Sequence, residues 1–303
     1  MGQERGRSRF LEESGPFGTS ARIGDCRTPD RGRAALAVRS ALAASGVWTL
    51  AFLLLAVAPT RAQEAPSTPP GQAPSFLADY NFHIDVEALS SADPRFSWDA
   101  SVGGDIDVID FGVGRVNLLA NYEVVMGDEL RPFDTNQGNY TLEASVALRV
   151  RGTEFSGVFH HVSRHLADRP KPASVAWNVL GVRMQRRFVT GSIAADVGSS
   201  IGAIVQHASV DYAWTGDLRA RIAHRLAPSF QLFGGGSVDW FGIDEARSAR
   251  DTQWSGRIEV GVRIGGRAGD VEVFVGYARR ADAYPTESAA RRWPLAGFRI
   301  VGG

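Results

Sequence analysis

Residues 159–168 contain three of the six histidines of the chain, together with a serine and an aspartate. In an extended strand, residues two apart project from the same face, so His161 and Ser163 would point the same way. A histidine beside a serine can act as its general base and activate the hydroxyl as a nucleophile. We therefore treat His161 and Ser163 as a candidate catalytic pair.

A pair of this kind needs a third group that orients the imidazole. Asn178 is the first candidate, because it shares the parity of Leu180 and Val182 in the next extended segment. Asp168 is the alternative. A metal site is not expected, because four residues along a strand separate His161 from His165 by about 13 Å. The same polar residues could instead order the following loop through hydrogen bonds and ion pairs.

The segments that carry these residues alternate apolar and polar side chains with a period of two, which is typical of strands. About twelve segments do so, with about 10 or 14 as alternatives. They cover 82–88, 98–108, 116–124, 140–150, 154–165, 175–186, 188–198, 209–225, 229–240, 252–264, 270–279 and 292–301. Many reach the length of about 10 residues that a tilted membrane-spanning strand requires. The pattern predicts an all-β, antiparallel transmembrane β-barrel over residues 77–303.

The connections between these segments alternate in length after the first hairpin. Short turns are expected near 110–114, 151–154, 185–188, 225–229 and 265–269, and longer loops near 126–139, 165–174, 199–208, 241–252 and 280–291. Short periplasmic turns and long outer loops are typical of bacterial outer-membrane barrels. All tryptophans of the predicted barrel fall nearer the long-loop end, where an indole can place its ring in lipid and its N–H in water.

Charged residues of both signs occupy the other strand face, and they are expected to line the lumen because charge facing lipid is costly. Examples are Glu87, Asp99, Glu143, Arg221 and Glu259. In a barrel of about twelve strands these side chains either fill the lumen with ion pairs or leave a narrow polar pore.

The N-terminal region is predicted to be a targeting segment. Arginines precede an apolar stretch at 46–58, and Thr60-Arg61-Ala62 provides a small-x-Ala cleavage site, so residues 1–62 are expected to be an N-terminal extension and secretory signal peptide. Translation could truly begin near Val38. Residues 63–76, rich in Pro, Gln, Ser and Ala, are expected to form a flexible periplasmic segment.

Composition excludes several classes of protein. The 33 basic and 33 acidic residues balance, which argues against nucleic-acid binding. The single cysteine excludes a disulfide framework and a cysteine-rich zinc site. No dinucleotide or phosphate-loop fingerprint is present, so no cofactor and no metal are expected.

The His-x-Ser pair at the outer end of a strand resembles outer-membrane phospholipase A and the lipid A 3-O-deacylases. This resemblance implies that His161 is the base and Ser163 the nucleophile, with an Asn or Glu on the next strand. Arg164 and His165 stand where the phospholipase pattern has Asn-Gly.

The longer run from His161 to Asp168 resembles an uncharacterised group of bacterial outer-membrane barrels with the signature His-x-Ser-x-His-Leu-Gly-Asp, except that Ala167 replaces the glycine. The sequence thus predicts an outer-membrane barrel, structural or with a narrow pore, whose enzymatic activity is undecided. The alternative is a lipid hydrolase of the phospholipase or deacylase type. The expected partners are outer-membrane lipids and the barrel-assembly machinery.

Overall fold

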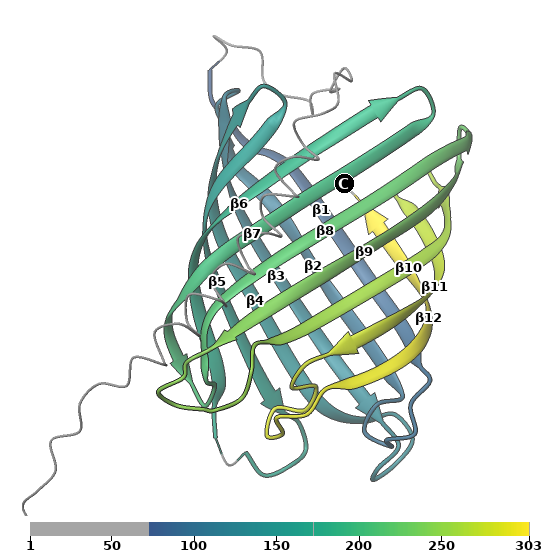
Figure 1. Cartoon of the computed structure of the whole chain (residues 1–303). Coiled ribbons are helices and arrows are strands. Elements are labelled where there is room, and N and C mark those ends of the chain that lie inside the picture. The colour runs from purple at the N-terminus through teal and green to yellow at the C-terminus, as the bar shows by residue number, and fades with distance from the viewer. Residues whose placement is uncertain (1–72, 172, 303) are drawn as a thin grey trace, which may run out of the picture. The chain divides into compact units, whose positions relative to one another are not determined.

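Twelve antiparallel strands form a closed barrel in this computed structural model, which describes residues 73–171 and 173–302 (Figure 1). Each strand pairs with the next along the chain, and β1 pairs with β12. The strands are β1 (Ser75–Leu89), β2 (Trp98–Asp110), β3 (Gly114–Gly127), β4 (Asp134–Val150), β5 (Thr153–Leu166), β6 (Val175–Thr190), β7 (Ile193–Ala208), β8 (Tyr212–Ala227), β9 (Phe230–Ile243), β10 (Gln253–Gly265), β11 (Asp270–Arg280) and β12 (Arg291–Gly302). The predicted fold class and strand number are confirmed.

The predicted leader and most of the predicted flexible segment lie outside the described residues. The barrel itself begins slightly earlier than predicted, since β1 starts at Ser75. The described residues contain no helix that is long and apolar enough to cross a membrane.

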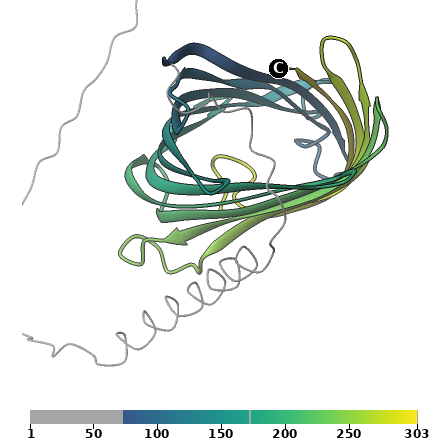
Figure 2. The same cartoon turned by 90° about the horizontal axis from the view of Figure 1, so that it is seen from above.

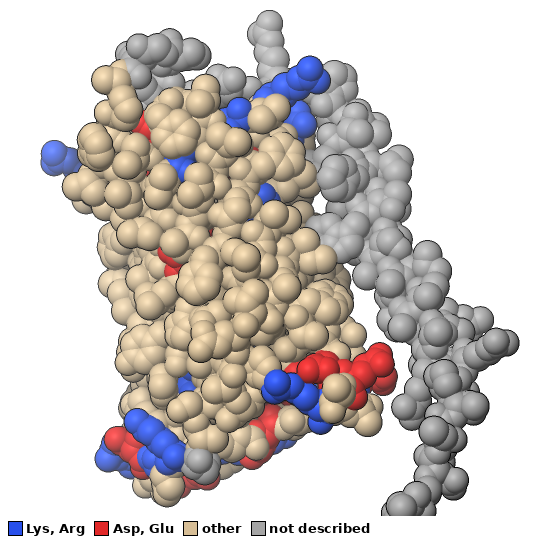
Figure 3. Space-filling view, turned by 90° about the vertical axis from the view of Figure 1, so that its left-hand side faces the viewer, with Lys and Arg blue, Asp and Glu red and all other residues tan. Residues whose placement is uncertain are grey.

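The outer wall of the barrel is apolar. Side chains such as Leu142, Leu180, Val182, Ile258 and Val273 point outward and are between 50% and 64% exposed. Most charged side chains on the face shown in Figure 3 lie toward the two ends of the barrel. An exposed apolar band of this extent is stable only in contact with lipid, and the fold is that of a bacterial outer-membrane protein.

One pair of connections differs from the prediction. The expected short turn at 185–188 lies inside β6, and the expected long loop at 199–208 forms the second half of β7. The true turn is at 191–192, and only residues 209–211 join β7 to β8. A β-bulge between Asn178 and Val179, which are paired with Gln206 and Ile204, adds Val205 to β7 and breaks the period-two pattern near the end of that strand.

Ion pairs fill the inner face of the wall, as the alternation of charges predicts. Glu272 is 1% exposed and lies within 3.0 Å of nitrogens of Arg221, Arg263 and Arg299. Elsewhere Arg183 forms a two-point pair with Glu143 at 2.5 and 2.6 Å. A carboxylate inside the barrel therefore lies among several arginines, which offsets the cost of removing its charge from water.

The loop between β11 and β12, residues 281–290, folds into the long-loop end of the barrel (Figure 2). We call this segment the plug loop. Ala281, Asp282, Ala283 and Tyr284 are all less than 10% exposed. Side chains from four strands hold it. Gln137 and Arg164 donate hydrogen bonds to its carbonyls. Tyr212 donates to the carboxylate of Asp282, and Ser255 accepts from the amide of Ala281.

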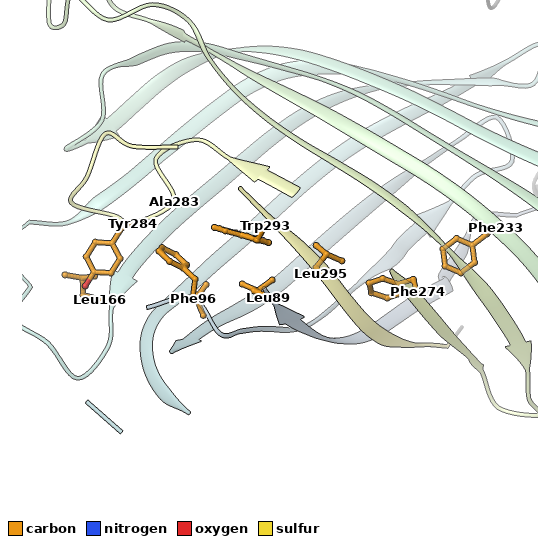
Figure 4. Close-up of a cluster of buried hydrophobic side chains, with 10 residues drawn as sticks. Leu89, Phe96, Leu166, Phe233, Phe274, Ala283, Tyr284, Trp293 and Leu295 are labelled. Atoms are coloured by element: carbon orange, nitrogen blue, oxygen red, sulfur yellow. The ribbon is translucent and has the colours of Figure 1, made fainter. Parts of the chain in front are cut away.

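A hydrophobic cluster supports the plug loop from inside the barrel (Figure 4). Trp293 stacks on Phe96 at 5.2 Å between ring centroids, and Ala283 and Tyr284 belong to the same cluster. Trp293 and Trp177 are at the long-loop end, as predicted, but they are only 2% and 8% exposed and pack inward. These two indoles therefore contribute to packing at the rim and not to a lipid-facing belt.

Acid should loosen the plug loop, because Arg95 links a carboxylate of the plug loop to a carboxylate of the β1–β2 loop. Arg95 contacts Asp93 at 2.8 Å and Glu287 at 2.5 Å, and its hydrogen bonds lower the pKa of both carboxyls. Such groups stabilise the fold above their unfolded-state pKa, and this contribution is lost as the pH falls through the lower folded-state pKa. We expect amide exchange in residues 281–290, corrected for its intrinsic rate, to accelerate below about pH 4.

Arg95→Gln is the control for this effect. It should exchange quickly already at neutral pH and show little further change on acidification. If the amides of the plug loop stay equally protected from exchange down to about pH 3, this role of Arg95 is contradicted.

Candidate functional site

Strands β5 and β6 bring the predicted site residues onto the outer wall of the barrel. His161 lies opposite Asn178 in the β5–β6 ladder and opposite Leu142 in the β4–β5 ladder. Residues of the same parity, Phe159 and Leu180, are 46% and 59% exposed on the lipid-facing side. The register of these strands therefore places His161, Ser163 and Asn178 on the outward face, as predicted.

A chain of side-chain hydrogen bonds fixes His161. Its Nδ1 lies 2.6 Å from Oδ1 of Asn178, and Nδ2 of Asn178 donates to Oε1 of Gln206 at 2.9 Å. Because the amide oxygen of Asn178 can only accept, Nδ1 of His161 must carry a proton. In the neutral imidazole this leaves Nε2 with a free lone pair, which is the state a general base requires.

Ser163 bonds a different histidine from the one predicted. Its Oγ lies 2.8 Å from Nε2 of His165, and no hydrogen bond joins it to His161 among the described residues. His165 is two residues beyond Ser163 and shares its face, so Ser163 lies between two imidazoles along one strand. The ring of His165 packs edge-on against Tyr140, with 5.6 Å between centroids.

Asp168, the alternative third member, is directed elsewhere. It has a positive φ of 52° in the loop after β5, and its carboxylate pairs with Arg131 at 2.8 Å. Both side chains are more than half exposed. Of the two candidates for orienting His161, the structure thus brings only Asn178 to the imidazole.

The third histidine of the cluster belongs to the opposite face. Nδ1 of His160 lies 3.1 Å from Oε2 of Glu143, which also binds Arg183. His160 is therefore part of the ion-pair lining of the lumen and is separated from the outer group by the wall of the barrel.

Two members of the outer polar group were not predicted from sequence. The i, i+2 spacing of Ser163 and His165 would have identified His165 as a possible partner. Gln206 could not be found in this way, because it lies past the bulge and in a segment predicted to be a loop. Together His161, Ser163, His165, Asn178 and Gln206 form a polar group on an otherwise apolar wall, which we call the outer polar row.

Comparisons with known proteins do not assign a role to this site. No protein-family model matches the sequence, and no curated protein matches it. The signature-bearing family suggested by the run from His161 to Asp168 thus stays a prediction.

Several solved barrels are similar in structure at low identity. The outer-membrane phospholipase dimer of Salmonella typhi is 12% identical, with a TM-score of 0.45 over 75% of this chain and 92% of that chain. Outer membrane phospholipase A from Escherichia coli gives the same identity and TM-score over 75% and 98%. An outer membrane channel from Pseudomonas putida F1 is 11% identical, with a TM-score of 0.46 over 78% and 99%.

Proposed function

We propose that this protein is a bacterial outer-membrane barrel that hydrolyses acyl esters of lipids on its lipid-facing surface. Ser163 acts as nucleophile, His161 as general base and Asn178 as the group that orients His161. The observation that carries the proposal is the His161–Asn178 hydrogen bond of 2.6 Å beside an imidazole-bonded serine on an apolar wall. Polar side chains facing lipid are costly, so a reason other than packing must account for them.

The first chemical step transfers an acyl group to the protein. Oγ of Ser163 attacks the ester carbonyl while Nε2 of His161 accepts the hydroxyl proton. The bond between the carbonyl carbon and the lipid alcohol oxygen then breaks, and that oxygen receives the proton from His161. Water cleaves the acyl-serine by the same route, releases the fatty acid and restores Ser163.

The reaction requires Ser163 to change its partner. Rotation about χ1 moves Oγ from His165 toward His161 without moving the strand. In the resting arrangement the hydrogen bond to His165 holds the hydroxyl on the outer face. We assign His161 the role of base because, of the two imidazoles, it is the one that a hydrogen bond to a neighbouring strand orients among the described residues.

Two features of the lumen argue against conduction as the main role. Ion pairs line the inner wall, and the plug loop lies in the long-loop end under bonds from Gln137, Arg164 and Tyr212. A narrow pore therefore has less support than the outer polar row gives to a hydrolase. If the protein cleaves no lipid, the interpretation that remains is a barrel with a purely structural role.

The proposal is tested by fatty-acid release from phospholipid and from lipid A, comparing His161→Ala with His165→Ala. His161→Ala should lower kcat by at least about a hundredfold, as expected for loss of a general base. His165→Ala should act mainly on KM or have a small effect on kcat. His224→Ala, an exposed histidine near the opposite end of the barrel, is the matched control.

The opposite ranking would overturn the assignment of His161 as base and give that role to His165. No release of fatty acid by the wild-type protein from any of these lipids would remove the hydrolase proposal itself.

A further inference from the structure

A small cavity with a cationic lining adjoins the outer polar row at the long-loop rim. It has a volume of about 270 Å³ and opens between the end of β5, the loop after it and the plug loop. Its side chains include Arg164, His165, Lys171, Ser174 and Thr286, and no carboxylate is among its lining residues. The cavity is thus lined by two basic side chains and by two hydroxyls that can donate hydrogen bonds.

Arg164 has no direct ion-pair partner among the described residues. Its guanidinium donates to the carbonyls of Asp282 and Ala283 at 2.6 and 2.8 Å and to Oε1 of Gln137 at 3.1 Å, which are all neutral oxygens. The carboxylate of Asp282 is bound instead by Arg250, at 2.8 Å. Within the described residues, no carboxylate lies within ion-pair distance of Arg164.

Lys171 is in the same situation. It is the only lysine of the chain, it is exposed on the loop after β5, and no ion pair to it is present among the described residues. The acidic residues of the neighbouring loops are engaged by other arginines: Asp168 by Arg131, and Glu129 and Asp134 by Arg169. Arg164 and Lys171 therefore leave an excess of positive charge at this cavity.

We propose that this cavity binds the phosphate of a phospholipid headgroup whose acyl ester is cleaved at Ser163, an inference that rests on the proposed hydrolase function. Cations and hydroxyl donors without competing carboxylates are the groups that bind a phosphate. His165 lines the cavity and bonds Ser163 at 2.8 Å, so it connects the two sites.

The spacing along the strand fits such a substrate. Ser163 and His165 are about 7 Å apart along β5, a distance that the glycerol backbone between a phosphate and its acyl ester can span. With the phosphate at the rim, the acyl chain would run down the apolar wall past Leu142 and Phe159, which are 51% and 46% exposed.

Binding can be tested separately from hydrolysis in a Ser163→Ala background. The protein, in an uncharged detergent, is titrated with a short-chain phosphatidylglycerol and with the corresponding uncharged diacylglycerol. In this background Lys171→Gln should weaken phosphatidylglycerol binding by about tenfold, as expected for loss of a charge-assisted hydrogen bond, and leave diacylglycerol binding unchanged. Lys171→Arg should restore it.

Arg247→Gln is the matched control, because Arg247 is an exposed cation on another loop of the same rim and does not line the cavity. Inorganic phosphate at constant ionic strength should displace the phosphatidylglycerol. Phosphate that binds without displacing the lipid would show a site for free phosphate and overturn the headgroup assignment.

Equal effects of Lys171→Gln and Arg247→Gln, or equal affinity for the charged and uncharged lipids, would also overturn this inference. These outcomes differ from failure of the hydrolase proposal, in which the wild-type protein cleaves no lipid whatever it binds.

Discussion

Ser163→Ala should lower the kcat for fatty-acid release by at least about a thousandfold, because the acyl-transfer step loses its nucleophile. The substitution removes one hydroxyl from a half-exposed position on the outer wall and leaves the register of β5 unchanged. The thermal unfolding of the barrel should therefore shift little. Activity is measured as fatty-acid release from phospholipid in mixed micelles.

Ser156→Ala is the control for this variant. Ser156 lies on the same strand but is buried on the inner face, so its removal should leave hydrolysis unchanged. Full activity in Ser163→Ala, or an equal loss in both variants, would mean that Ser163 is not the nucleophile.

Removal of the plug loop should convert a closed barrel into a conducting one. The loop occupies the long-loop end of the lumen, where Arg164 and Gln137 bind its carbonyls and Tyr212 and Arg250 bind Asp282. Replacing residues 283–288 with a short Gly-Ser linker takes away Tyr284 and its packing in the hydrophobic cluster. We expect steady conductance in planar bilayers from the shortened protein and none from the wild-type protein.

A similar replacement of residues 245–250 in the loop between β9 and β10 is not a neutral control, because Arg250 also binds Asp282. Replacing 245–248 avoids that contact and should leave the barrel closed. Equal conductance of the wild-type and plug-shortened proteins would contradict the role assigned to the plug loop.

Much of this fold could be predicted from the alternation of side chains. A barrel strand places every second residue in lipid, so the pattern at 140–150 and 154–165 predicts both the strands and their outward faces. The same parity predicted that His161, Ser163 and Asn178 lie on one wall. The neighbouring residues Leu142 and Leu180 are exposed on the outer wall, which confirms this arrangement.

The parity rule fails where the backbone inserts a residue. The bulge opposite Asn178 shifts the phase near the end of β7, within the half of that strand that was predicted to be a loop and that contains Gln206. A second limit is the choice of hydrogen-bond partner. Parity places both His161 and His165 beside Ser163, and only side-chain rotamers and neighbours such as Tyr140 decide which imidazole the hydroxyl contacts.

The plug loop was beyond sequence analysis for a related reason. The length of 280–291 predicted a long outer loop, but nothing in its composition indicates that it turns inward. Its position depends on Arg164, Tyr212 and Arg250, which come from strands and a loop far away in sequence and meet only when the barrel closes.

The central claim is that Ser163 is a nucleophile activated by an imidazole on the lipid-facing wall. It is tested most directly by treating the folded protein with a lipid-like fluorophosphonate and locating the covalent adduct by mass spectrometry. We predict a single adduct on Ser163, formed much more slowly in His161→Ala. No adduct on Ser163 under conditions in which the barrel is folded would contradict the claim.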